Sequence, residues 1–285
     1  MDSFAEYVRQ FADLINAGAA IPLPSATERA PLPEANPDAP AVLIFSPHPD
    51  DEVIMGALAL RLARQCQWRI VNVAVTLGSK VSRRGERRTE LANCCRKIGF
   101  ELLEIGPDGL ESVNPATAQA NDRIWTEAVE TIRRLLISYR PRLVLFPHED
   151  DWNSTHIGVN RLLRQALAEA ALSPGPWICE TEFWGQMPSP NLLVESSTED
   201  VADLVSALAC HVGEVRRNPY HLTLPAWMME NVRRAELVVG QGGAVPPIRF
   251  GTLYRLGRWR NGCIDKSSTG RALLRPEDPA ALFPE

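Results

Sequence analysis

From residue 41 onward, short apolar runs of strand length alternate with segments of helical periodicity, and this alternation constrains the fold more than any other feature of the chain. The strand-like runs occupy residues 41–46, 69–76, 100–105 and 142–146. The helical segments occupy residues 54–65, 86–98, 121–139 and 157–171. Strands that alternate with amphipathic helices form βαβ crossovers, which build a parallel sheet covered on both faces. The sequence therefore predicts an α/β fold, a Rossmann-like and mostly parallel sheet with helices on both faces.

The rest of the chain follows this pattern less closely. Further strands are expected at residues 177–184, 191–196 and 249–256, and further helices at 199–217 and 225–239. We expect this less regular C-terminal part to add edge strands and to form one side of the substrate pocket. At the other end, an amphipathic segment precedes a connector rich in Pro and Ala at residues 20–40. The predicted organisation is an N-terminal helix and connector at 1–40, a Rossmann-like domain at 41–260 and a C-terminal tail at 261–285.

The composition excludes several classes of protein. A formal net charge of −5 over 285 residues gives no electrostatic reason to expect nucleic acid as a partner. No run of 18 apolar residues exists, so no membrane-spanning helix is expected. The N-terminus lacks the basic and continuous apolar regions of a secretory signal, and the six cysteines form no CxxC pair. We therefore expect a cytoplasmic protein whose thiols are reduced.

One imidazole and three carboxylates are concentrated in residues 48–52, within the sequence Ser-Pro-His-Pro-Asp-Asp-Glu that begins at residue 46. This segment directly follows the first predicted strand, and ligands of open α/β sheets bind beyond the carboxyl ends of the strands. A single aspartate here would be explained as a helix cap. Adjacent carboxylates repel one another unless a cation or a shared proton relieves them, and the flanking prolines stiffen the turn. The segment therefore predicts a metal site.

A second polar segment, residues 147–156, follows the fourth predicted strand and reads Pro-His-Glu-Asp-Asp-Trp-Asn-Ser-Thr-His. In a sheet of strand order 3-2-1-4-5, strands one and four are neighbours, and their C-terminal loops face each other across a crevice. The topology alone thus brings this segment next to residues 48–52. His148 or His156 taken singly could be an ordinary loop histidine, but the shared location makes His156 a candidate metal ligand.

The two segments resemble the motifs of the PIG-L/LmbE family of zinc-dependent N-deacetylases. His-Pro-Asp-Asp-Glu at residues 48–52 matches the leading motif of that family, and residues 151–156 match the ends of its second motif. The resemblance implies three zinc ligands, which are His48, Asp51 and His156. It also implies that Asp50 is the general base and that Glu52 has a local positioning role.

Further likenesses extend the resemblance over residues 41–215. They include Arg87 in an Arg-x-x-Glu helix and His211 near the end of a later helix, where Gly213-Glu214 replaces the usual Ser-Gln. One departure falls within the second motif, because Asn153 stands where the family usually has a histidine.

The resemblance implies hydrolysis of the N-acetyl group of an amino-sugar-like small molecule, such as an N-acetylated sugar or glycoconjugate. Two histidines and one aspartate leave open positions for water and substrate, as catalytic zinc sites do. The zinc ion would polarise the acyl carbonyl and activate water, while Asp50 takes up the proton and returns it to the leaving amine. Asn153 and His211 are the candidate donors to the oxyanion.

Candidate substrate-binding residues are Arg87, Asp151 and Trp152. Several of the candidates have a purely structural alternative. Arg87 could form a surface ion pair with Glu90, and Trp152 could either stack on a sugar or fill the core. Asn153 could form only an Asx-turn at the start of the following helix, and His211 could be a helix histidine with a satisfied partner.

Three other functions fit parts of the pattern. A two-histidine, one-carboxylate set is also the facial triad of non-heme Fe(II) enzymes, and only fold analogy argues against it. A nucleotide-binding protein should carry a glycine-rich fingerprint after strand one, where this chain has carboxylates that would repel a pyrophosphate. A non-catalytic carbohydrate-binding relative predicts the loss of a ligand or of the base, yet all four positions are intact. The sequence leaves homo-oligomerisation open.

Overall fold

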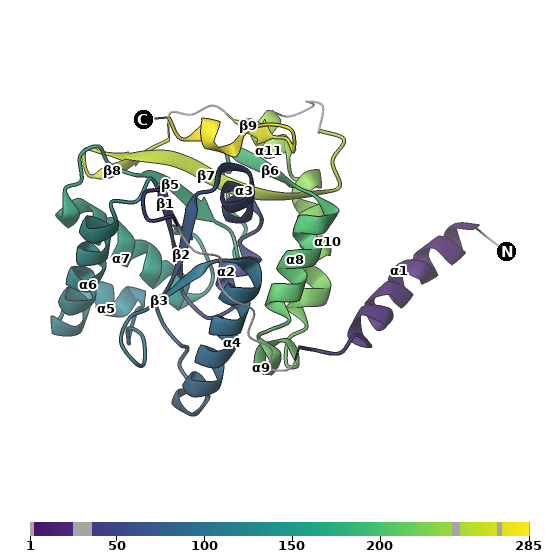
Figure 1. Cartoon of the computed structure of the whole chain (residues 1–285), viewed down its shortest axis with the longest axis horizontal. Helices are drawn as coiled ribbons and strands as arrows, with labels where there is room; N and C mark the ends of the chain where they lie inside the picture. Colours follow the sequence, from purple (N-terminus) through teal and green to yellow (C-terminus); the bar gives the residue numbers. More distant parts are fainter. Residues whose placement is uncertain (1–2, 25–35, 241–245, 267–269, 285) are drawn as a thin grey trace.

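The centre of the molecule is a mixed sheet in the order β3-β2-β1-β4-β5-β7-β6-β9, with β8 paired to β7 (Figure 1). The computed structural model describes residues 3–24, 36–240, 246–266 and 270–284. The first five strands run parallel, and they are β1 (Ala41–Ser46), β2 (Arg69–Ala74), β3 (Glu101–Glu104), β4 (Leu143–Pro147) and β5 (Trp177–Thr181). The predicted order 3-2-1-4-5 is confirmed.

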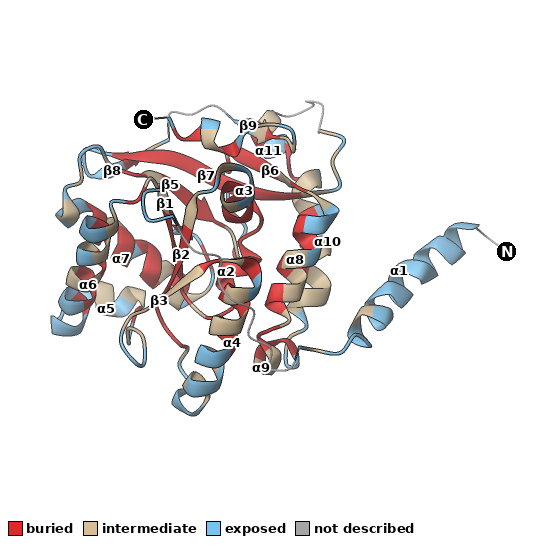
Figure 2. Cartoon of the chain, in the orientation of Figure 1, coloured by how far each residue is buried: buried red, intermediate tan, exposed pale blue. Residues whose placement is uncertain are grey.

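Helices cover both faces of the parallel strands because these strands are apolar on both sides. Alternate residues of β1 belong to different cores, with Val42 and Ile44 in one and Leu43 and Phe45 in the other. The helices that close the first core are α3 (Leu58–Cys66), α4 (Arg84–Ile98) and α8 (Thr198–Leu208), and those that close the second are α6 (Arg123–Tyr139) and α7 (Ser154–Ala170). Figure 2 shows the buried residues concentrated in the sheet and on the inner sides of these helices. The predicted α/β fold with helices on both faces is confirmed.

The helix predicted at residues 54–65 is divided at Gly56 into α2 (Asp51–Ile54) and α3. Gly56 has a φ of +92°, and a Cβ atom there would lie 2.1 Å from Oγ1 of Thr252 on a distant strand. Only glycine fits this close approach with a left-handed backbone. The break leaves Asp51 and Glu52 of the first motif on a separate short helix, whose members are all buried.

Other helices also differ from the predictions in their limits. Residues predicted as two helices at 199–217 and 225–239 form α8, α9 (Val212–Val215), α10 (Tyr220–Arg233) and α11 (Glu236–Val239). The sequence patterns did not predict α5 (Pro115–Ala120), whose first turn is capped by the side chain of Asn114. The ends of helices depend on such local contacts more than on periodicity, so these limits are the least predictable part of the fold.

The C-terminal strands extend the sheet beyond its parallel half. They are β6 (Leu192–Ser196), β7 (Phe250–Arg260), β8 (Cys263–Asp265) and β9 (Arg271–Leu273), and a short 3₁₀ helix, η2 (Pro279–Leu282), follows them. The strand β7 runs antiparallel to both β5 and β6. Buried Arg61 of α3 donates hydrogen bonds to the carbonyls of Leu273 and Leu274, which ties the end of the chain to the first core. The sheet thus continues past residue 260, while the domain limits drawn from the sequence stay a prediction.

The N-terminal segment forms the helix α1 (Ser3–Ala19), as predicted, and this helix projects from the rest of the molecule (Figure 1). Of the predicted connector at 20–40, residues 25–35 lie outside the described residues. Among the helices of the described part, none has the length and apolar character needed to cross a membrane.

Candidate metal centre

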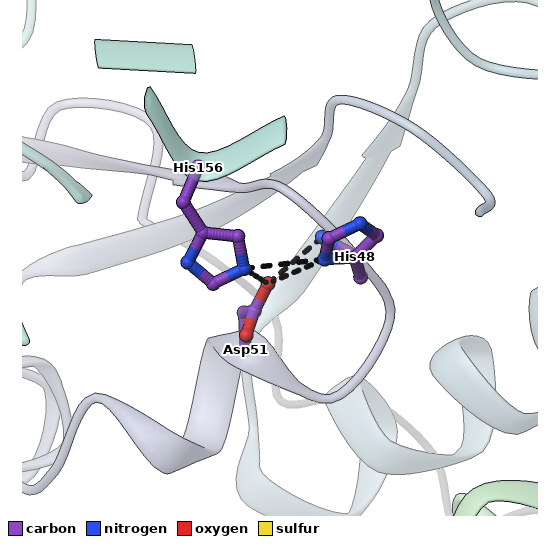
Figure 3. A group of neighbouring side chains, drawn as sticks. All are labelled: His48, Asp51 and His156. Atoms are coloured by element: carbon purple, nitrogen blue, oxygen red, sulfur yellow. Dashed lines mark hydrogen bonds and ion pairs between the residues drawn. The ribbon is translucent and has the colours of Figure 1, made fainter. Parts of the chain in front are cut away.

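Three side chains from the two sequence motifs meet at the carboxyl edge of the sheet (Figure 3). His48 lies in the turn after β1, Asp51 is the first residue of α2, and His156 lies in the first turn of α7, which follows β4. Because β1 and β4 are adjacent parallel strands, their C-terminal loops face each other. The structure therefore brings together the three residues predicted as metal ligands.

The ligand atoms of this trio have the spacing that one small cation requires. His48 Nδ1 lies 3.2 Å from His156 Nε2, and Asp51 Oδ2 lies 3.4 Å from the first nitrogen and 3.3 Å from the second. Ligands about 2.0–2.2 Å from a tetrahedral ion lie roughly 3.3–3.6 Å from one another. Two nitrogens and one carboxylate oxygen are also a donor set typical of catalytic metal sites. The residues present fit a divalent metal ion.

The neighbouring charges bias the trio toward a cation, against the effect of burial. Burial alone would raise the pKa of Asp51, but His156 and His48 outweigh it and hold that pKa below its usual range. Burial alone would lower the pKa of His156, but the carboxylates of Asp51 and Asp151 outweigh it and raise the pKa to about 9. Burial lowers the pKa of His48 despite the neighbouring Asp51. The trio therefore favours a positive charge where its ligand atoms meet.

Asp151 lies behind His156, the third candidate ligand. Its Oδ2 lies 3.6 Å from Nδ1 of His156, and both side chains are fully buried. Two backbone N–H groups fix this carboxylate, since Asn153 donates to Oδ1 at 2.8 Å and Trp184 to Oδ2 at 3.3 Å. A carboxylate on the far nitrogen of a metal-binding histidine sets its tautomer and ring orientation. Asp151, predicted as a substrate-binding residue, is placed by the structure as a partner of His156 and does not line the cavity.

Asp50 occupies the turn just before α2, in a left-handed conformation with a φ of +115°. Its backbone N–H donates to Oε2 of Glu52 at 2.9 Å, which stabilises this strained turn. Oδ2 of Asp50 lies 3.6 Å from Nη2 of Arg87, and that guanidinium also donates to the carbonyl of Pro49 at 2.7 Å. Burial, followed by the charge of Asp51, raises the pKa of Asp50 well above its usual range, although Arg87 opposes the shift. Arg87 thus pairs with the motif itself and not with Glu90 as the sequence allowed.

A cavity of about 490 Å³ opens beside the trio and is lined by His48, Asp50 and Asp51. Its other walls come from both halves of the chain, with Arg87, Trp152, Asn153, Trp184, Glu214, Arg217 and Tyr220 among them. Trp152 is 79% exposed and therefore does not fill the core. Trp184 packs on Tyr220 at a ring distance of 5.2 Å. The sequence patterns did not predict Arg217 and Tyr220 as cavity residues, because neither belongs to a motif. They reach the cavity only because α9 and α10 pack there.

The two predicted oxyanion donors are placed differently. Asn153 lines the cavity and also caps α7, because its Oδ1 accepts the N–H of Thr155 at 2.8 Å. His211 is fully buried away from the cavity lining, with Nε2 2.7 Å from Oε1 of Glu52. Glu52, His211 and Cys94 are close enough to form a second metal set. Burial, however, raises the pKa of the Cys94 thiol, so the set lacks a thiolate, and the contact between Glu52 and His211 anchors α2.

The fold and this trio define an α/β protein with a candidate metal site at the switch point of its sheet. Residues 43–167, which carry both motifs, match the PIG-L family, described as GlcNAc-PI de-N-acetylase. Comparison with curated protein sequences gave no significant match.

Solved structures share the fold at low sequence identity. N,N′-diacetylchitobiose deacetylase from Pyrococcus horikoshii is 17% identical, and the match covers 90% of this chain and 93% of that one with a TM-score of 0.55. The zinc-inhibited form of teicoplanin deacetylase Orf2 is 14% identical, with 78% and 99% covered and a TM-score of 0.54. GalB, a 4-carboxy-2-hydroxymuconate hydratase from Pseudomonas putida, is 14% identical, with 76% and 95% covered and a TM-score of 0.58. These likenesses establish the fold.

Metal binding should release a proton. Because the pKa of His156 is raised to about 9, its imidazole is protonated at pH 7, and a metal ion must displace that proton. Affinity for a divalent ion should fall about tenfold per pH unit below pH 9. Calorimetric titration in buffers of different ionisation enthalpy should show about one proton released per ion at pH 7.

The matched control is His221→Ala, which removes a histidine of α10 outside the trio and should bind metal as the wild type does. His156→Ala should lose the metal and the proton release together. Metal affinity that does not change between pH 6 and pH 8 would contradict the assignment.

Proposed function

We propose that this protein is a zinc-dependent hydrolase that removes an N-acetyl, or other N-acyl, group from an amino-sugar-like small molecule. The observation that carries the proposal is the convergence of His48, Asp51 and His156 within 3.4 Å of one another, beside Asp50 on one cavity. The family match over residues 43–167 supports the same class of reaction. Deacetylases among the proteins of like fold agree with it, while GalB is a reminder that this fold alone does not choose the chemistry.

Zinc is the metal that we assign to the trio. It binds nitrogen and oxygen ligands in tetrahedral sites, and enzymes leave one position of that site open. When bound, it supplies a Lewis acid that polarises an acyl carbonyl and makes water a nucleophile near neutral pH. His48 and His156 would hold it through Nδ1 and Nε2, and Asp51 through Oδ2. Asp151 would keep the ring of His156 in the orientation that this requires.

Asp50 is the residue that moves the proton. Its carboxyl lines the cavity one position before Asp51, whose side chain is engaged with the two histidines. The raised pKa of Asp50 suits a group that must accept a proton from water and then donate it to the leaving amine. Arg87 limits that shift and fixes the turn, because it contacts both Oδ2 of Asp50 and the carbonyl of Pro49.

The cavity walls fit a sugar-like substrate. Aromatic side chains of Trp152, Trp184 and Tyr220 supply apolar surface on which the C–H groups of a sugar ring can pack. Trp152 can do so without disturbing the core, since most of its surface is exposed. Arg87 and Arg217 supply N–H donors for hydroxyl or anionic groups of the substrate.

Asp50→Asn should separate metal binding from chemistry. The amide keeps the shape of the side chain but cannot accept the proton, so kcat for an N-acetylated amino sugar should fall about 10²-fold or more. Metal content should stay at the wild-type level. The control is Asp108→Asn, which changes an exposed carboxylate outside the cavity and should leave kcat unchanged. Loss of the metal in Asp50→Asn would instead make Asp50 a ligand and place the base elsewhere.

Asn153 should act as a donor to the oxyanion, besides capping α7. Asn153→Asp keeps an oxygen for the cap but removes the N–H donor, so stability should be retained while kcat falls by about 10²–10³. Asn153→Ala should lose both, with about 1 kcal/mol of the free energy of unfolding. Asn153→His should keep measurable activity and add an ionisation between roughly pH 5 and 8 to the rate profile. Normal kcat in Asn153→Asp would leave only the capping role.

A further inference from the structure

The helix α1 exposes an apolar stripe along its whole length. No residue of α1 is buried, and Figure 2 shows the helix pale blue along nearly all of its length where it projects from the molecule. The large apolar side chains of Tyr7, Val8, Phe11, Leu14 and Ile15 are between 44% and 65% exposed. Exposed apolar surface of this extent on one element marks an interaction site.

The spacing of the stripe is that of a helix that packs against another helix. Tyr7, Phe11 and Leu14 follow one another at intervals of four and three, as alternating a and d positions of a heptad do. Val8 and Ile15 occupy the adjacent e positions, so the stripe is as wide as that of a core-facing helix in a bundle. The charged residues of the helix lie off the stripe, so no like charges meet when two copies of the stripe face each other.

The root of α1 is fixed on the body of the protein. A Cβ atom added at Gly18 would lie 2.9 Å from Leu222 of α10, which shows how closely the helix end approaches α10. A few residues later, Leu23 packs against the first core. These two contacts direct α1 outward, so the part of the body that the structure describes does not cover its stripe (Figure 1).

Charge argues against a lipid surface as the occupant of the stripe. Helices that lie on anionic membranes are rich in Lys and Arg on the polar face. α1 has two acidic residues, Glu6 and Asp13, against the single basic Arg9. The remaining occupant is a protein helix with a complementary apolar surface. The stripe on α1 of a second copy of the chain is such a surface.

We propose that α1 is a dimerisation arm that pairs in antiparallel orientation with α1 of a second copy of this chain. In that register Tyr7 faces Phe11 of the partner subunit, and the two bodies lie at opposite ends of the pair. Each aromatic side chain can bury about 150–250 Å². Two stripes together thus bury on the order of 1,000 Å², which reaches the lower limit of a specific interface. The symmetric, self-complementary contact is of the kind that forms closed dimers.

Sedimentation equilibrium of the full chain tests the arm. The wild type should show twice the chain mass of 31.6 kDa, with dissociation on dilution. Phe11→Glu combined with Leu14→Glu should give the single-chain mass. Ala5→Glu combined with Asn16→Glu adds the same two charges to exposed positions off the stripe and should remain dimeric. Because no residue of α1 is buried, unchanged circular dichroism of the body should accompany all variants.

Three results would overturn the proposal. A single-chain mass for the wild type at high concentration excludes the dimer. An unchanged dimer in the Phe11→Glu, Leu14→Glu variant places the interface elsewhere. Co-sedimentation of single wild-type chains with phosphatidylglycerol vesicles assigns the stripe to a membrane. The mass measurement does not depend on hydrolysis, so it stands or falls separately from the proposed enzyme activity.

Discussion

The parallel pairing of β1 with β4 is the constraint on which the rest of the site depends. Their register joins Val42 to Leu143, so the two strands end at the same edge of the sheet. The chain then continues from β1 into the turn of His48 and from β4 into the loop that leads to His156. Apolar cores bury both faces of these strands, so backbone hydrogen bonds of the sheet set the distance between the loops. Candidate ligands held by such rigid elements are already in place for the proposed ion.

The polar groups around this edge are buried in pairs of carboxylate and imidazole. Asp51 lies between His48 and His156, Asp151 lies behind His156, and Glu52 contacts His211. An unpaired buried charge costs several kcal/mol of stability, so pairing each carboxylate with an imidazole lowers the cost of burying it. The pair of Glu52 and His211 also ties the short helix α2 to the junction of α8 and α9, which keeps the backbone of the first motif in position. The adjacent residues Asp51 and Glu52 are thus tolerated because each has a different partner.

The sequence predicted the parallel half of the fold well because β1 to β5 are apolar runs separated by helices with their own periodicity. It also predicted that the two motifs meet, since the switch-point rule depends only on strand order. The break at Gly56 was not predictable, because it depends on Thr252 from a strand far along the chain. The position of Asp151 was not predictable either, because backbone groups of Asn153 and Trp184 hold its carboxylate near His156.

The central claim is that His48, Asp51 and His156 hold one zinc ion at the cavity. The most direct measurement is anomalous X-ray diffraction from crystals of the protein purified without added metal, with data on both sides of the zinc absorption edge. The account predicts one anomalous peak per chain, within bonding distance of His48 Nδ1, Asp51 Oδ2 and His156 Nε2, that disappears below the edge. A peak at the iron edge, or a zinc peak only at the Glu52, Cys94 and His211 cluster, would contradict it.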